Sequence, residues 1–211
     1  MKFNRQGCPY IIKKELKMST KKRLTLHRHS DKTPDGKHIS HAGKLLAMAT
    51  GAIYKDQVHH VFFGPLIRTT ESLCYLTAGN PEVFSDVTIF PSPIIGLGDE
   101  ALFTQIATSK FKNLVSTEGL SFLEATLQAH DNETVEEFGQ KSILAIRDMF
   151  QTMKDRQIGV GVFHDPIIAL AAHFLGFENA RSLESMESIT FEQDEDGSIT
   201  VVGINPAGMV I

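Results

Sequence analysis

Short apolar runs alternate along the chain with segments whose apolar residues recur at helical spacing. Six of the runs predict β-strands: Arg23–His27, Val58–Phe63, Val87–Phe90, Ile158–Phe163, Ser188–Glu192 and Ser198–Ile204. The run Ile158–Phe163 is apolar throughout, which is typical of a strand that is buried on both faces. The last two runs flank Asp194-Glu195-Asp196-Gly197, which favours a hairpin turn.

Helical patterns occupy the intervals between these runs. Four helical regions are predicted: Ser40 to Ile53, Leu66 to Leu76, Ala101 to about Asp155, and a last helix that opens at Asp165-Pro166. The Ser40 hydroxyl can cap the first helix, and Pro166 suits the first turn of the last one. The longest helix begins near Asn132, and its inner stripe is predicted to contain Val135, Phe138, Ile143, Ile146, Met149 and Phe150.

Strands that alternate with helices predict an α/β fold. We expect three αβα layers, with a mostly parallel central sheet covered on both faces and a C-terminal hairpin. We assign residues 23–211 to this domain and residues 1–22 to a basic N-terminal extension. Met1–Arg28 contains nine Lys and Arg residues and one acid, and its apolar stretches are too short for a signal-peptide core. Met18 offers a second start, which would make residues 1–17 an added extension.

The composition is that of an ordinary globular chain, with 42% hydrophobic and 22% charged residues. A formal net charge of −4 argues against a general nucleic-acid-binding protein. No run approaches the ~18–20 apolar residues of a membrane-spanning helix. Cys8 and Cys74 form no CxxC motif, which argues against a disulfide framework or a thiolate metal site and favours the cytoplasm. The pattern is compatible with a single chain or an oligomer.

Reactive side chains follow the first four predicted strands. They are Arg28 and His29 after the first strand, Arg68 after the second, Asp99 and Glu100 after the third, and His164 and Asp165 after the fourth. Ligands of parallel α/β sheets bind beyond the carboxyl ends of the strands. We therefore expect these side chains to converge on one edge of the sheet.

This set of residues suits phosphate chemistry. Two guanidinium groups facing one pocket favour a phosphate group, because each planar fork can bond two oxygens. A histidine among them can attack phosphorus and form a covalent intermediate, and a second histidine, if protonated, would stabilise the charged oxygens. A carboxyl group could protonate the leaving oxygen and later accept a proton from water. No step in this scheme needs a metal or another cofactor.

A metal site is the main alternative for the histidines. It would use His27, His29, His59 and His60, but no acidic cluster of ligand spacing accompanies them. His59 and His60 are adjacent in a strand, so their side chains point to opposite faces. We expect structural roles for His27, His59 and His60, no metal ligands, and a position for Lys32 at the pocket mouth, where it could contact substrate.

Four stretches in order resemble the histidine phosphatase superfamily, the phosphoglycerate-mutase-like family. LTLHRHSDK resembles its opening strand and Arg-His motif, and ISHAGKLLA, with Gly43, is similar to the helix start that follows. HVFFGPLIRTTESL resembles the segment with the second arginine, and VGVFHDPIIALAAHFLG the strand and helix around the second histidine. The resemblance extends from about Arg23 to Gly176 and implies this fold, with no cofactor.

The resemblance also implies roles for the site residues. His29 would be the nucleophile, and Arg28, Arg68 and His164 would hold the phosphoryl oxygens. The smaller branch of the family takes its acid from the loop after the third strand, which favours Glu100 over Asp99, whereas the other branch favours Asp165. Three features depart from the family pattern: Ser30 in place of the usual glycine, Gly64 where a serine is common, and His164 followed by Asp165 instead of glycine.

The function expected from this resemblance is metal-independent hydrolysis of a phosphomonoester through a phosphohistidine on His29. The substrate would be a phosphorylated small molecule or a phosphoprotein, with no nucleic-acid or membrane partner. A phosphomutase would need the intermediate shielded from water, and helices between Asp99 and Thr134 offer only a modest cap. A catalytically weak protein that binds phosphate or a phosphorylated ligand is the second alternative.

Overall fold

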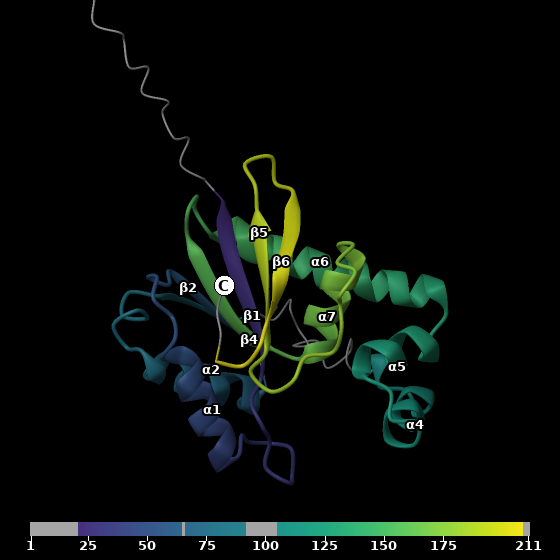
Figure 1. Cartoon of the computed structure of the whole chain (residues 1–211). Coiled ribbons are helices and arrows are strands. Elements are labelled where there is room, and N and C mark those ends of the chain that lie inside the picture. Colours follow the sequence, from purple (N-terminus) through teal and green to yellow (C-terminus); the bar gives the residue numbers. More distant parts are fainter. Residues whose placement is uncertain (1–20, 65, 92–104, 209–211) are drawn as a thin grey trace, which may run out of the picture.

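The computed structural model describes residues 21–64, 66–91 and 105–208 (Figure 1). Within these residues the centre is a six-stranded sheet in the order β3-β2-β4-β1-β5-β6. The strands are β1 (Lys22–Arg28), β2 (His60–Phe63), β3 (Thr88–Pro91), β4 (Ile158–Phe163), β5 (Ser188–Gln193) and β6 (Ile199–Asn205). The first four are parallel to one another, whereas β5 runs antiparallel to β1 and forms a hairpin with β6. The predicted mostly parallel sheet and C-terminal hairpin are confirmed.

Helices cover both faces of the sheet, as predicted (Figure 1). They are α1 (His41–Gly51), α2 (Ile67–Gly79), α4 (Ser109–Ser116), α5 (Phe122–Ala129), α6 (Asn132–Thr152) and α7 (Asp165–Phe174). One face packs Ala47 and Leu76 of α1 and α2 against Val160 and Val162. On the other face, α6 and α7 enclose a larger core around Phe62 and other buried side chains. The six residues of the predicted inner stripe of α6 are all buried.

Some boundaries differ from the pattern along the chain. β2 begins at His60 rather than Val58, because the Val58 amide bonds the Val83 carbonyl, outside the sheet. β1 begins at Lys22, which pairs with Gln193. The predicted helical region from Ala101 lies partly outside the described residues and contains α4, α5 and α6 in the part that is described. No helix in residues 21–64, 66–91 or 105–208 has the length and apolar character to cross a membrane.

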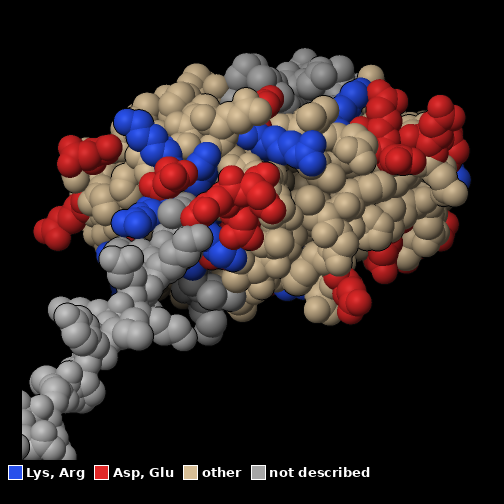
Figure 2. All heavy atoms as spheres, turned by 90° about the horizontal axis from the view of Figure 1, so that it is seen from above, with Lys and Arg blue, Asp and Glu red and all other residues tan. Residues whose placement is uncertain are grey.

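At the edge of the sheet where β1 begins, charged side chains of both signs form ion pairs. Seen from above, Lys and Arg side chains lie among Asp and Glu side chains (Figure 2). Lys21 pairs with Asp194 at 3.2 Å, and Arg23 pairs with Glu192 at 2.9 Å. These two ion pairs connect the start of β1 to the β5–β6 hairpin.

α1 and α2 pack in close backbone contact near the C-terminal end of each helix. A Cβ on Gly51 would lie 1.8 Å from the Leu76 carbonyl oxygen, and a Cβ on Gly79 would lie 2.1 Å from the Met48 carbonyl oxygen. Glycine is therefore required at both positions, because any larger residue would separate the two backbones.

We expect Gly51→Ala to lower the free energy of unfolding by about 3 kcal/mol, because overpacking a rigid backbone contact forces the helices apart. Urea denaturation followed by circular dichroism measures this change. Gly64→Ala is the matched control, since a Cβ there meets Phe163 and Thr69 only at ordinary contact distances of 3.5 Å. Equal stabilities for the two variants would contradict the expected clash.

Candidate active site

The ends of two neighbouring parallel strands place two histidines side by side. β1 ends at Arg28 and β4 ends at Phe163, and these two residues are partners in the strand register. The His29 amide donates to the Phe163 carbonyl at 2.9 Å and continues the ladder by one residue. His29 and His164 therefore meet at the carboxyl edge of the sheet, with ring centroids 4.9 Å apart and ring planes at 71°.

Hydrogen bonding and burial fix the protonation of the His29 ring. Its Nδ1 lies 2.8 Å from the Ser30 carbonyl oxygen, which can only accept, so Nδ1 carries the proton. Burial, together with the charges of Arg68, Arg28 and Lys32, lowers the pKa of His29 to about 3, against the opposing effect of this hydrogen bond. The ring is therefore neutral near pH 7, and its Nε2 retains a lone pair.

Arg68 lies in the first turn of α2 and contacts the second histidine. Its Nη2 donates to His164 Nδ1 at 3.4 Å, so the proton of neutral His164 resides on Nε2. Burial, followed by the charges around it, lowers the pKa of His164 well below its usual value. His164 is therefore a neutral hydrogen-bond donor near pH 7, whereas the scheme drawn from the sequence allowed a positive charge there.

The loop after His29 is tied to the starts of both neighbouring helices. The Ser30 hydroxyl donates to the Gly43 carbonyl at 2.8 Å, and its amide donates to the Ser72 hydroxyl at 2.9 Å. The Ser72 hydroxyl in turn donates to the Arg68 carbonyl at 2.8 Å. A Cβ on Gly43 would lie 2.5 Å from the Asp31 carbonyl oxygen, so glycine lets α1 approach the loop. Ser30, which departs from the family pattern, is therefore accommodated by its own hydrogen bonds.

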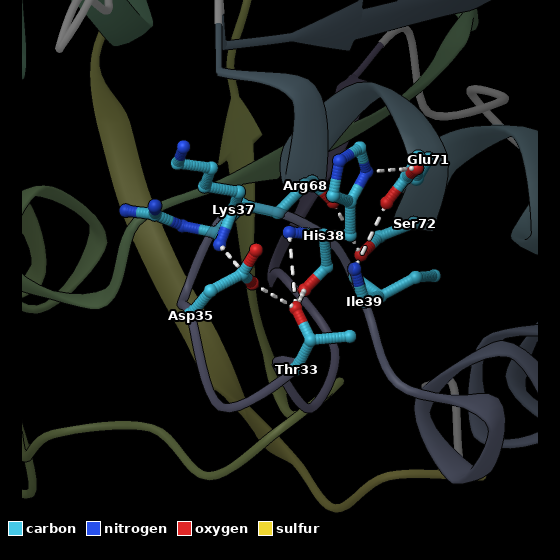
Figure 3. Close-up of polar contacts among 8 residues, drawn as sticks. All are labelled: Thr33, Asp35, Lys37, His38, Ile39, Arg68, Glu71 and Ser72. Atoms are coloured by element: carbon cyan, nitrogen blue, oxygen red, sulfur yellow. Dashed lines mark hydrogen bonds and ion pairs between the residues drawn. The ribbon is translucent and has the colours of Figure 1, made fainter.

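A second loop, Thr33–His38, packs against α2 and contacts Arg68 (Figure 3). Arg68 Nη1 donates to the Gly36 carbonyl at 3.2 Å. Glu71, one turn further along α2 than Ile67, accepts from His38 Nδ1 at 2.8 Å and from the Ile39 amide at 2.9 Å. Glu71 thus holds the end of this loop while Arg68 contacts its tip. The guanidinium of Arg68 is positioned between the loop and His164.

Arg28 is held by the segment before β5 and lies near α5. Its Nη1 donates to the Leu183 carbonyl, its amide donates to the Glu187 carbonyl at 2.9 Å, and its guanidinium carbon lies 6.0 Å from the centre of the Phe122 ring. Burial lowers the pKa of Lys32, and the guanidinium groups of Arg68 and Arg28 lower it further. Three cations therefore act on one buried pair of histidines, an electrostatic setting that favours an anion.

Of the three predicted proton donors, the structure describes only Asp165. Asp99 and Glu100 lie outside the described residues. Asp165 is the first residue of α7, is 2% exposed, and accepts a hydrogen bond from the Leu183 amide. Burial raises its pKa to about 6, although the bond from Leu183 and the charge of Arg28 oppose the rise. A carboxyl group with this pKa can hold or release a proton near neutral pH.

The remaining histidines of the metal alternative lie away from this pair. His27 Nδ1 donates to the Met186 carbonyl at 3.0 Å, and its Nε2 accepts from the Tyr54 hydroxyl at 2.6 Å. His60 bonds Gln157 at 2.6 Å, and His59 accepts from the Ile158 amide. In the part of the chain that the structure describes, no group of three or more His, Cys, Asp or Glu residues is arranged to hold a metal.

The structure also brings in groups that the sequence reasoning missed. Ser72 follows Arg68 by four residues on α2, and this helical spacing could have identified it. The Leu183 and Ser30 carbonyls had no such signal, because every residue carries the same main-chain oxygen.

The sequence matches no protein-family model and no curated protein. By structure, the phosphoglycerate mutase of Bacillus anthracis is similar over 90% of this chain and 94% of its own, with a TM-score of 0.63 and 13% identity. Phosphoserine phosphatase of Entamoeba histolytica is similar over 87% and 96%, with a TM-score of 0.56 and 15% identity. Alpha-ribazole phosphatase of Shigella flexneri is similar over 90% and 98%, with a TM-score of 0.59 and 11% identity. The chain has the phosphoglycerate-mutase-like fold, as the sequence resemblance implied.

We expect the free energy of unfolding to decrease as the pH is lowered from about 7 to about 5. Burial lowers the pKa of His27 to about 4, that of His29 to about 3 and that of His164 in the same direction. Each histidine stays neutral in the folded chain but gains a proton below about pH 6.5 in the unfolded chain. Protonation of the unfolded chain therefore lowers the free energy of unfolding by about 2 kcal/mol per histidine at pH 5. Asp165 acts with the opposite sign, because its raised pKa lets the folded chain bind a proton in this range.

Urea denaturation at several pH values measures this dependence. His29→Gln should flatten it, because one of the three contributing histidines is removed. His41→Gln, on the exposed start of α1, should leave the pH dependence as it is. Stability that is constant or increases toward pH 5 would contradict the buried neutral state of the three histidines.

Proposed function

We propose that this protein is a phosphatase of the histidine phosphatase superfamily, which hydrolyses phosphomonoesters through a phosphohistidine on His29. The observation that carries the proposal is the state of His29. The Ser30 carbonyl accepts a hydrogen bond from Nδ1–H of His29, and the pKa of this imidazole is lowered to about 3. The centre of its ring lies 4.9 Å from the centre of the His164 ring. A neutral imidazole with a lone pair on Nε2 is the nucleophilic form of histidine.

In the first step, His29 Nε2 attacks phosphorus and forms the P–N bond as the P–O bond to the leaving group breaks. The leaving oxygen takes its proton from a carboxylic acid. In the second step, water attacks phosphorus, the P–N bond breaks, and the same carboxylate accepts the proton of the water. Inorganic phosphate and the alcohol are released, and His29 returns to its starting form.

The groups around His29 suit the charge of the transferring phosphoryl group. Arg28 and Arg68 each present a planar donor fork, and His164 presents Nε2–H because Arg68 bonds its Nδ1. These donors are already oriented by protein contacts, so little reorganisation accompanies the build-up of charge on the oxygens. Lys32 adds a positive charge at the same edge and is a candidate contact for substrate.

We assign the proton transfers to Glu100, with Asp99 as the alternative in the same loop. Asp165 has a pKa compatible with the role, about 6, but its Oδ1 is engaged by a main-chain amide. A general acid must lie within hydrogen-bond reach of the leaving oxygen, and the resemblance favours Glu100 for that position.

Hydrolysis is favoured over phosphoryl transfer between two positions of one substrate. Two of the three neighbours described above are phosphatases, and one is a mutase. In the described part of the region between Asp99 and Thr134, α4 and α5 are eight residues each, which is short for a cap that would have to exclude water from a phosphohistidine. The proposed substrate is a phosphorylated small molecule, with a phosphoprotein as the alternative, and the proposed compartment is the cytoplasm.

A phosphate-binding protein without turnover is the second candidate function. The departures at Ser30 and Gly64 favour it, because a site that had lost its catalytic geometry would still have the cations that bind phosphate. Ser30 is accommodated by bonds to Gly43 and Ser72, which supports a working loop instead.

We expect the unaltered protein to hydrolyse p-nitrophenyl phosphate in the presence of a chelator, and His29→Ala to lose at least about 100-fold in kcat/KM. Removal of the nucleophile abolishes the covalent path, whereas a chelator removes nothing that the path needs. The release of p-nitrophenol measures the rate, and acid-labile, base-stable labelling with radioactive substrate detects the phosphohistidine.

His173→Ala is the control, because this histidine is exposed on α7, away from the site. Activity that disappears with the chelator would overturn the metal-free mechanism. Phosphate binding without hydrolysis, seen by calorimetry, would favour the second candidate function.

A further inference from the structure

A short segment before β5, Arg181–Glu187, forms one wall of the site and is fixed at both ends. At its start, Arg181 donates to both carboxylate oxygens of Glu187, at 2.7 and 2.9 Å. At its end, the Glu187 carbonyl accepts from the Arg28 amide and the Met186 carbonyl accepts from His27. The Glu184 amide also donates to the Glu187 carboxylate at 2.8 Å. The segment is therefore a closed turn attached to the end of β1.

The Leu183 peptide groups at the centre of this segment connect Asp165 with Arg28. The Leu183 amide donates to Asp165 Oδ1, and the Leu183 carbonyl accepts from Arg28 Nη1. Leu183 is 1% exposed and Asp165 is 2% exposed, so the contact between these two residues is shielded from water. The chain of contacts is Asp165 carboxylate, Leu183 main chain, Arg28 guanidinium.

We propose that Asp165 is a positioning residue, which fixes Leu183 and through it the phosphate-binding orientation of Arg28, and that it is not the proton donor. The inference deepens the proposed function and rests on it. An arginine side chain has several rotatable bonds, so a guanidinium without a fixed acceptor loses much of its preorganisation for phosphate. The Leu183 carbonyl is such an acceptor, and Asp165 holds it in place.

The geometry of the carboxyl group argues against direct proton transfer. Oδ1 accepts the Leu183 amide, an arrangement that favours the unprotonated oxygen, and Oδ2 is buried without surface exposed to water. A general acid has to present its proton to the leaving oxygen at hydrogen-bond distance. Asp165 presents its carboxyl group to the Arg181–Glu187 segment instead.

The first test measures the binding of inorganic phosphate by calorimetry to the full-length protein. We expect Asp165→Ala to weaken binding by about tenfold, because Arg28 loses its fixed orientation. Asp165→Asn should weaken it less, since an amide oxygen still accepts from the Leu183 amide. In an Arg28→Gln background, Asp165→Ala should cause no further loss, because its effect passes through Arg28.

The second test separates positioning from proton donation. We compare p-nitrophenyl phosphate, whose leaving group needs little protonation, with phenyl phosphate and an alkyl phosphate, whose leaving groups need more. Asp165→Ala should lower kcat/KM for all three by a similar factor. A loss confined to the poorer leaving groups, with phosphate affinity unchanged, would assign Asp165 as the acid and overturn the inference.

Asn205→Ala is the matched control for a merely structural effect. Asn205 is as fully buried as Asp165 and donates to Ser188 and Thr190 of the β5–β6 hairpin rather than to Asp165, Leu183 or Arg28. It should reduce stability, measured by thermal unfolding, without changing phosphate affinity. Phosphate binding equal to that of the unaltered protein in folded Asp165→Ala would overturn this inference alone. An unaltered protein that binds no phosphate would contradict the proposed function, and the inference with it.

Discussion

The parallel pairing of β1 with β4 is the constraint on which the candidate site depends. Both strands end at the same level, since Arg28 is the partner of Phe163, and the His29 amide extends the ladder by one bond. The residue after each of these strand ends is a histidine, His29 after β1 and His164 after β4. The pairing of the two strands therefore brings the two rings together. A shift of register by one residue would turn one ring to the other face of the sheet.

This arrangement places neutral histidines where charged ones would be costly. Burial and three neighbouring cations keep protons off His29 and His164, and the Ser30 carbonyl and Arg68 determine which nitrogen of each ring carries the single proton. The same environment that lowers stability toward acidic pH leaves His29 with a lone pair on Nε2, the form in which it can act as the proposed nucleophile. The low pKa values and the neutral, lone-pair-bearing form of His29 are therefore two results of one cause, the burial of imidazoles beside fixed positive charge.

The sequence predicted the parts of this site that follow from periodicity. Apolar runs located the strand ends, and the residues directly after them include His29 and His164, which the structure brings into contact. Side chains could be assigned because the carboxyl ends of parallel strands share one edge. The main-chain acceptors could not be assigned in this way. Leu183 is apolar and buried, and the position of its carbonyl depends on the Arg181–Glu187 turn, whose shape follows from no periodic pattern. The proposed positioning role of Asp165 could not be predicted either, because it depends on the same turn.

Main-chain participation also bears on how a site of this kind tolerates sequence change. The structural neighbours share only 11–15% of their residues with this chain, yet the fold is retained. The contacts that orient Arg28 and the His29 ring come from carbonyl oxygens, which are present whatever the side chain. Ser30 shows where tolerance of sequence change becomes narrower. A side chain at this buried position needs hydrogen-bond partners, which Gly43 and Ser72 provide for the Ser30 hydroxyl and amide. A few charged and imidazole side chains, oriented by main-chain contacts, are therefore enough to build the candidate site.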